Sequence, residues 1–252
     1  MGLGAGAEHT ARLGKGRGPR GTAVSGVVLL LPGGEEVSAR RPSPLTAGTV
    51  RALSGHLARR GGPEGLATHV VRYRVRGWNG ERAGLAGDAE WAADEVVRRY
   101  GDVPVCLVGV GMGGRAALRA AGHPAVGSVL SIAPWLPVDD TAAPEPVKQL
   151  AGRRVMIVHG THDGRTDPER SFRLAARVKK ANRDICRFEV HADGHGLRQY
   201  RAEVLALSAD FVLGALFGAA FSRPVADAFA APPPLGLRMP LASGFGRTLR
   251  KP

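Results

Sequence analysis

The chain of 252 residues is long enough for one large α/β domain, and 44% of its residues are hydrophobic. Its net charge of +13 comes in good part from its ends, because residues 1–22 hold four basic residues and one acidic residue, and residues 218–252 hold five and one. Only 5% of the residues are aromatic, whereas specific nucleic-acid binding uses clustered basic and aromatic side chains. We therefore expect no specific nucleic-acid partner.

The sequence predicts a cytoplasmic protein without a membrane span. No run reaches the roughly 18 apolar residues that a transmembrane helix needs, and residues 1–21 lack the apolar centre of a secretory signal. The two cysteines, Cys106 and Cys186, lie in apolar strand patterns. Buried thiols of this kind are typical of a reducing compartment.

Composition divides the chain into three parts. Residues 1–22 are rich in Gly and Arg and predict a basic, disordered segment. Residues 23–217 carry the periodic apolar patterns of a folded domain, and residues 218–252 predict a Pro-rich basic tail.

Within the folded part, apolar segments alternate with helical patterns. Strands are predicted for residues 22–31, 68–75, 105–108, 125–133, 154–159 and 185–190. Helices are predicted for residues 45–60, 88–100, 115–121, 168–180 and 197–217. This alternation predicts a single-domain α/β fold, a doubly wound and mostly parallel sheet with helices on both faces. Ligands bind beyond the carboxyl ends of such strands.

A glycine turn at residues 109–114 allows two interpretations. Its pattern Gly-Val-Gly-Met-Gly-Gly matches the fingerprint of an NAD(P)-binding oxidoreductase. It also matches the strand–turn–helix of a nucleophile elbow, with Gly111 at the nucleophile position. The dinucleotide interpretation needs an acidic residue at the end of the next strand, but that strand ends at Ile132 and the first acid is Asp139. The elbow interpretation is therefore favoured.

Two distant residues complete the elbow pattern. Asp163 follows a later strand and His195 follows the last one, which is the chain order of nucleophile, acid and base. In these motifs, residues 24–217 resemble the α/β-hydrolase superfamily, in particular esterase-like serine hydrolases with little or no lid. The resemblance implies an oxyanion hole formed by the backbone N–H groups of Gly34 and Met112.

The resemblance lacks its nucleophile, since glycine has no group that attacks a carbonyl. Losing the nucleophilic serine costs on the order of 10⁶ in turnover. Ser131 is a possible substitute, but a neighbouring strand places it about 5 Å to the side. Neither cysteine stands at a strand end. The histidines and aspartates near Asp163 and His195 match no metal-ligand spacing, so we expect neither a metal nor another cofactor.

Three functional hypotheses remain for the hydrolase-like site. His195, oriented by Asp163, could activate a water molecule and hydrolyse esters without a covalent intermediate. The site could instead bind a small ester-like or apolar ligand without turnover, as a pseudoenzyme, or it could be a structural remnant. Trp135 begins the loop where such proteins contact their substrate, and we expect it to line the binding site.

Overall fold

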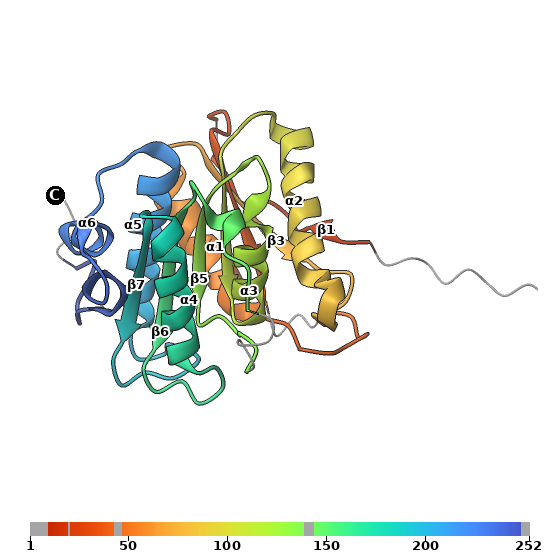
Figure 1. Ribbon diagram of the computed structural model, residues 1–252. Coiled ribbons are helices and arrows are strands. Elements are labelled where there is room, and N and C mark those ends of the chain that lie inside the picture. Colours follow the sequence, from red (N-terminus) through yellow and green to blue (C-terminus); the bar gives the residue numbers. More distant parts are fainter. Residues whose placement is uncertain (1–9, 20, 43–46, 139–143, 248–252) are drawn as a thin grey trace, which may run out of the picture.

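The computed structural model describes residues 10–19, 21–42, 47–138 and 144–247. An eight-stranded sheet lies between two layers of helices (Figure 1). The strands are β1 (Arg12–Leu13), β2 (Gly26–Leu31), β3 (Leu66–Arg72), β4 (Val105–Val110), β5 (Val126–Ile132), β6 (Arg154–Gly160), β7 (Ile185–Val190) and β8 (Met239–Pro240). Their order across the sheet is β1-β3-β2-β4-β5-β6-β7-β8.

In the described residues, six helices and four short 3₁₀ turns accompany the strands. The helices are α1 (Gly48–Gly61), α2 (Gly84–Tyr100), α3 (Met112–Arg119), α4 (Pro168–Ala181), α5 (Arg201–Phe217) and α6 (Arg223–Ala230). The 3₁₀ turns are η1 (Gly80–Arg82), η2 (Ala120–Gly122), η3 (Lys148–Leu150) and η4 (Leu235–Leu237). All strand pairs are parallel except β1 with β3. The predicted doubly wound, mostly parallel sheet is confirmed.

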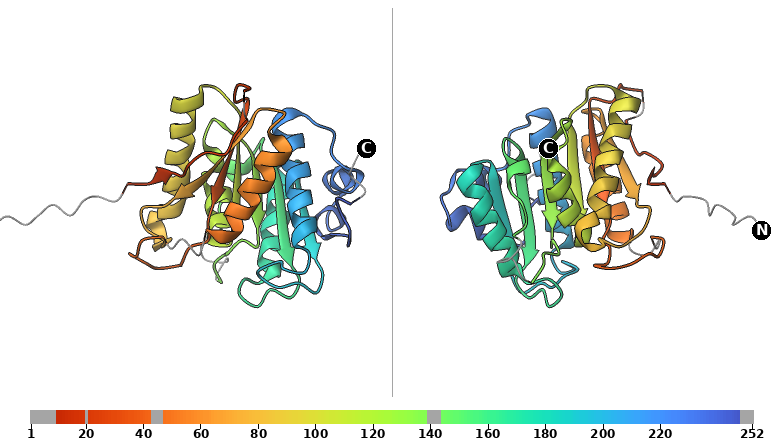
Figure 2. Two further views of the ribbon diagram at one scale, coloured as in Figure 1. Left: turned by 180° about the vertical axis from the view of Figure 1, so that it is seen from behind. Right: turned by 45° about the vertical axis from the view of Figure 1, so that its right-hand side comes forward.

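The sheet separates two apolar cores. Helices α2, α3 and α4 cover one face, and helices α1, α5 and α6 cover the other (Figure 2). Strand β2 shows how one sequence serves both cores, because Val27 and Leu29 face the first and Val28 and Leu30 face the second. All six residues of β2 are buried, which explains its unbroken apolar sequence.

The C-terminal segment is part of the folded structure. Helix α6 buries Val225 and Ala228 in the same core as α5, against β7, and β8 extends the sheet beyond β7. The guanidinium group of Arg187, fully buried in β7, donates hydrogen bonds to the Glu189 carboxylate (2.7 Å) and the Leu237 carbonyl (2.9 Å). The prediction that a tail begins at residue 218 was therefore wrong, because the segment's short apolar stretches find partners only in the tertiary structure.

The N-terminal segment is also ordered in part. Residues 12 and 13 pair with β3, and the Gly14 N–H donates to the Val70 carbonyl at 2.8 Å. The predicted disorder of residues 1–22 was wrong for residues 10–19, while residues 1–9 lie outside the described residues. None of the helices in the described ranges has the length and apolar character needed to cross a membrane.

The folded C-terminal segment makes a prediction about stability. Leu237 is fully buried, whereas Leu235 in the same 3₁₀ turn is 66% exposed. We expect Leu237→Ala to lower the free energy of unfolding by about 2–5 kcal/mol and the matched control Leu235→Ala to leave it nearly unchanged, as measured by urea denaturation. Equal effects of the two substitutions would show that the segment does not pack as described.

Candidate active site

The glycine turn between β4 and α3 has the geometry of an elbow. Gly111 stands at the N-cap of α3 with φ 59° and ψ −121°, a conformation that favours glycine. Its N–H donates to the Ile132 carbonyl at 2.9 Å, and its own carbonyl accepts the Trp135 N–H at 3.0 Å. The turn is thereby bound to the end of β5 and to the loop that follows.

Close backbone contacts require glycine on both sides of Gly111 but not at Gly111 itself. A Cβ atom at Gly109 would lie 2.0 Å from the Gly113 oxygen, and one at Gly113 would lie 2.2 Å from the Leu31 oxygen. A Cβ atom at Gly111 would meet nothing nearer than the Cε1 and Nε2 atoms of His195, both 3.8 Å away. The space above Gly111 therefore holds room for a small group and faces the imidazole.

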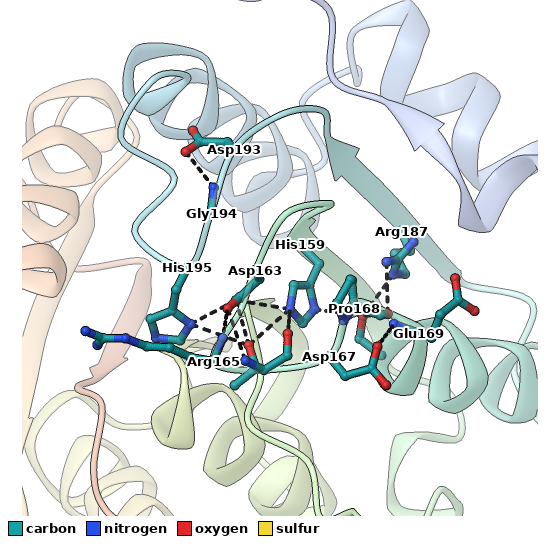
Figure 3. Close-up of polar contacts among 12 residues, drawn as sticks. His159, Asp163, Arg165, Asp167, Pro168, Glu169, Arg187, Asp193, Gly194 and His195 are labelled. Carbon is teal, nitrogen blue, oxygen red and sulfur yellow. Dashed lines mark hydrogen bonds and ion pairs between the residues drawn. The ribbon is translucent and has the colours of Figure 1, made fainter.

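His195 and Asp163 form a hydrogen-bonded pair, although 32 positions separate them in the chain. The His195 Nδ1 atom lies 2.9 Å from Asp163 Oδ2 (Figure 3). Asp163 is in the loop after β6 with a fully buried side chain, and His195 is in the loop after β7 with a side chain 28% exposed. Because Asp163 engages Nδ1, Nε2 is the ring nitrogen available to accept a proton at Gly111.

Three further residues hold the Asp163 carboxylate. It accepts the N–H groups of Arg165 (2.8 Å) and Thr166 (3.0 Å) and the Thr166 hydroxyl (2.6 Å), and the Nε2 atom of buried His159 lies 3.3 Å away. Burial by itself raises the pKa of Asp163, but the hydrogen bonds from His159, Thr166 and Arg165 together hold this pKa well below its ordinary value. The carboxylate stays ionised and orients the imidazole.

A second aspartate shapes the loop that carries His195. The buried Asp193 side chain accepts the N–H groups of Gly194 (2.9 Å), Gln199 (3.0 Å) and Tyr200 (3.2 Å). A Cβ atom at Gly160 would lie 2.5 Å from the backbone carbonyl oxygen of Asp193. Glycine at the end of β6 therefore lets the loop after β6 and the loop after β7 lie against each other. No local sequence pattern predicts this role of Asp193, because two of its three partners lie six and seven residues further along the chain.

These loops surround a cavity of about 650 Å³. Its lining consists of Gly33, Gly34, Gly48, Thr49, Ala52, Leu53, Val110, Gly111, Met112, Ile132, Trp135, Arg165, Thr166, His195, Gly196, Leu197, Arg198, Arg201, Val204 and Leu205. The predicted site residues Gly34, Gly111, Met112, Trp135 and His195 thus line one space, with Asp163 behind His195. Their catalytic and binding roles stay predictions.

The alternative nucleophiles lie outside this cavity. Ser131 is fully buried, and its Oγ atom would lie 2.7 Å from a Cβ atom at Gly114. Both cysteines are buried, and burial raises the pKa of the Cys106 thiol to about 12. Within the described ranges, no three His, Cys, Asp or Glu side chains group to hold a metal ion.

A cation stack that no sequence pattern predicts supports the elbow. The Arg115 guanidinium, on α3, lies 4.0 Å from the ring centre of Trp78 and 5.2 Å from that of Trp135. It also forms an ion pair with Glu145 at 2.8 Å. The stack links the loop after β3 to the loop after β5 across the start of α3. Its members are distant in sequence, so no local pattern marks them.

Comparisons with known proteins point to one superfamily. The model of the prolyl oligopeptidase family matches residues 133–218, about a third of the chain, including Asp163 and His195 but not Gly111. No match was found among curated protein sequences.

Solved structures share the fold. An α/β serine hydrolase homologue from Coxiella burnetii has a TM-score of 0.57 at 17% identity, covering 82% of this chain and 99% of its own. An esterase from Pyrococcus furiosus has a TM-score of 0.60 at 13% identity, covering 77% and 82%. A lidless serine hydrolase from Xanthomonas campestris has a TM-score of 0.56 at 14% identity, covering 79% and 86%.

The fold and these likenesses agree with the motifs of the sequence. The chain has the α/β-hydrolase fold, and the resemblance to the α/β-hydrolase superfamily that its motifs predict is confirmed. The elbow, the Asp163–His195 pair and the cavity occupy one end of the parallel sheet, beyond the carboxyl ends of its strands.

The lowered pKa of Asp163 predicts a pH-dependent stability. An aspartate whose folded-state pKa is depressed stabilises the fold above its unfolded pKa of about 3.9, and this stabilisation is lost as the pH falls further. We expect Asp163→Asn to lower the free energy of unfolding at pH 7 by about 1–3 kcal/mol. The difference in free energy of unfolding between this variant and the natural protein should shrink below about pH 4.

Urea denaturation at pH values between about 7 and 3 measures this difference, with the exposed Asp102→Asn as control. A difference that does not change with pH would contradict the depressed pKa of Asp163.

The elbow geometry predicts unequal costs for added methyl groups. Gly111→Ala places its Cβ in ordinary van der Waals contact with the His195 ring, without a clash, but keeps an unfavourable φ, which costs about 1–3 kcal/mol. Gly113→Ala drives its Cβ into the Leu31 carbonyl, so its cost should exceed that of Gly111→Ala. Thermal and urea unfolding compare the two variants, and equal stabilities would show that the close approach is absent.

Proposed function

We propose that this protein hydrolyses small carboxylic esters by general-base activation of water, without a covalent intermediate. The observation that carries the proposal is the placement of His195. Its Nδ1 atom lies 2.9 Å from Asp163 Oδ2, and its Nε2 atom would lie 3.8 Å from a Cβ atom at Gly111. The ring therefore faces the space above Gly111. A nucleophilic side chain is missing there, but the partner that would activate a nucleophile is present.

The reaction balances with water as the nucleophile. A water molecule above Gly111 gives a proton to His195 Nε2 while its oxygen attacks the ester carbonyl carbon. The carbonyl π electrons move to the oxygen and form a tetrahedral oxyanion. When the intermediate collapses, the C–O bond to the alcohol breaks and the imidazolium returns the proton to the departing oxygen. The products are a carboxylic acid and an alcohol.

Two backbone groups can stabilise the oxyanion. Met112 is the first residue of α3, whose unpaired N–H groups and positive end favour a negative charge. Gly34 lies against the elbow, since a Cβ on it would be 3.5 Å from the Met112 Cγ atom. Donors aimed at a developing oxyanion contribute several kcal/mol to the barrier in known hydrolases. Neither donor requires a side chain at residue 111.

Esters are a better match than amides for this mechanism. An amine leaves less readily than an alcohol, and the acyl-enzyme route is absent at Gly111. Similarity to an esterase from Pyrococcus furiosus supports the same substrate class. The cavity's apolar residues, among them Leu53, Ile132 and Val204, suit an aliphatic acyl chain.

A second candidate function is binding of a small apolar or ester-like ligand without turnover. The same cavity of about 650 Å³ supports it, because this volume accommodates a small molecule. The NAD(P)-dependent alternative has less support, since His195 faces the elbow where a pyrophosphate would need open space.

Restoring the missing hydroxyl tests the proposal. We expect Gly111→Ser to raise p-nitrophenyl butyrate hydrolysis about 100-fold or more, because the serine would lie beside an oriented base. The matched control Gly111→Ala has the same backbone strain and no hydroxyl, so it should show no gain.

The natural protein provides the second arm of this test. If His195 is the general base, His195→Ala should reduce the basal rate by about 10²–10⁴ without altering the fold seen by circular dichroism. A basal rate that His195→Ala leaves unchanged would reject the general-base proposal and favour the ligand-binding function.

A further inference from the structure

Three arginine side chains surround the mouth of the cavity. Arg165 lies in the loop after β6, Arg198 in the loop before α5, and Arg201 is the first residue of α5; all three are exposed and line the cavity. Figure 3 shows the Arg165 side chain extending past the His195 ring. Two parts of the chain that are distant in sequence, the loop after β6 and the start of α5 with the loop before it, therefore bring cationic groups to one cavity.

These guanidinium groups lack the acidic partners that other arginines have. In the described part of the chain, none of the three forms an ion pair with a carboxylate, and no Asp or Glu lines the cavity. Elsewhere, Arg115 pairs with Glu145 and Arg238 with Glu169. In a chain of net charge +13, unpaired surface arginines are not unusual. These three differ from the other unpaired arginines because they line one cavity, whose described lining contains no carboxylate.

Helix ends add charge of the same sign. Helix α1 begins at Gly48 and Thr49, and α5 begins at Arg201, all in the cavity lining. The N-terminus of a helix carries about half a positive charge. The side chains and the helix ends together favour an anion at the mouth.

The interior of the cavity has the opposite character. Leu53, Ile132, Val204 and Leu205 line it beside the Gly111 space. A ligand that suits both regions has an apolar chain and a negatively charged end.

We propose that the substrate is an anionic ester, in which an apolar chain separates the scissile ester from a carboxylate or phosphate that Arg198, Arg201 and Arg165 recognise. The guanidinium fork matches both anions through paired N–H···O bonds. The position of the ester over Gly111 rests on the proposed function, whereas recognition of the anion requires no turnover.

Calorimetric titration of the natural protein with two related esters tests the proposal. Monomethyl suberate carries one ester and one carboxylate, and dimethyl suberate has the same chain without the charge. We expect the monoester to bind about tenfold more tightly at low salt, equivalent to about 1.4 kcal/mol. This preference should weaken at high ionic strength because salt screens exposed charges. A methyl ester of matched length with a terminal phosphate shows which anion is preferred.

Two double variants with equal net charge locate the effect. Arg198→Gln/Arg201→Gln removes two cations from the mouth, and we expect it to abolish the preference for the monoester. The control Arg82→Gln/Arg183→Gln removes two exposed cations that do not line the cavity, and it should keep the preference.

Each outcome decides a separate point. Equal affinities, tighter binding of the diester, binding of neither ester, or equal effects of the two double variants would overturn the anion proposal. Preferential binding of the monoester without hydrolysis would leave the anion site in place and reject only the proposed function. Hydrolysis of both esters with no preference for the charged one would support the proposed function and reject the anion site.

Discussion

The close approach of three backbone segments at the elbow is the constraint on which the site depends. Gly113 lies against the Leu31 carbonyl at the end of β2, and Gly109 lies against Gly113 itself. Neither contact leaves room for a Cβ atom. Because these segments touch, the loop after β2, the end of β4 and the start of α3 reach one cavity. The loop after β5 joins them through the hydrogen bond from the Trp135 N–H to the Gly111 carbonyl. None of these contacts needs a side chain at residue 111.

The Asp163–His195 pair has a separate source of order. Asp163 is held by the backbone of its own loop and by buried His159, and Asp193 fixes the loop that carries His195. None of these contacts involves Gly111. The pair therefore does not depend on a side chain at residue 111. Because it joins the loop after β6 to the loop after β7, it has a structural role besides the chemical role proposed for it.

Local patterns carry the predictable part of this structure. The buried strands were predictable because each is a short apolar run, and Gly111, Asp163 and His195 were predictable because each follows such a run in a known order. Long-range partners decided the rest. The helix predicted to start at residue 88 begins instead at Gly84, and the Asp88 carboxylate, inside α2, accepts the Arg74 N–H at 2.8 Å. Strand β8 is two residues long and is defined only by its pairing with β7.

The basic mouth and the elbow would contribute to catalysis in different ways. Charge at the mouth contacts a part of the substrate that does not react, so it stabilises the bound ester and the transition state equally. Such uniform binding lowers KM without raising kcat. The donors at Gly34 and Met112 meet a full negative charge only when the oxyanion forms, so they act on kcat. If the proposed water route makes the chemical step slow, tighter binding of the substrate would still raise kcat/KM. Cationic side chains at the opening would supply that binding without occupying the space that a water molecule needs above Gly111.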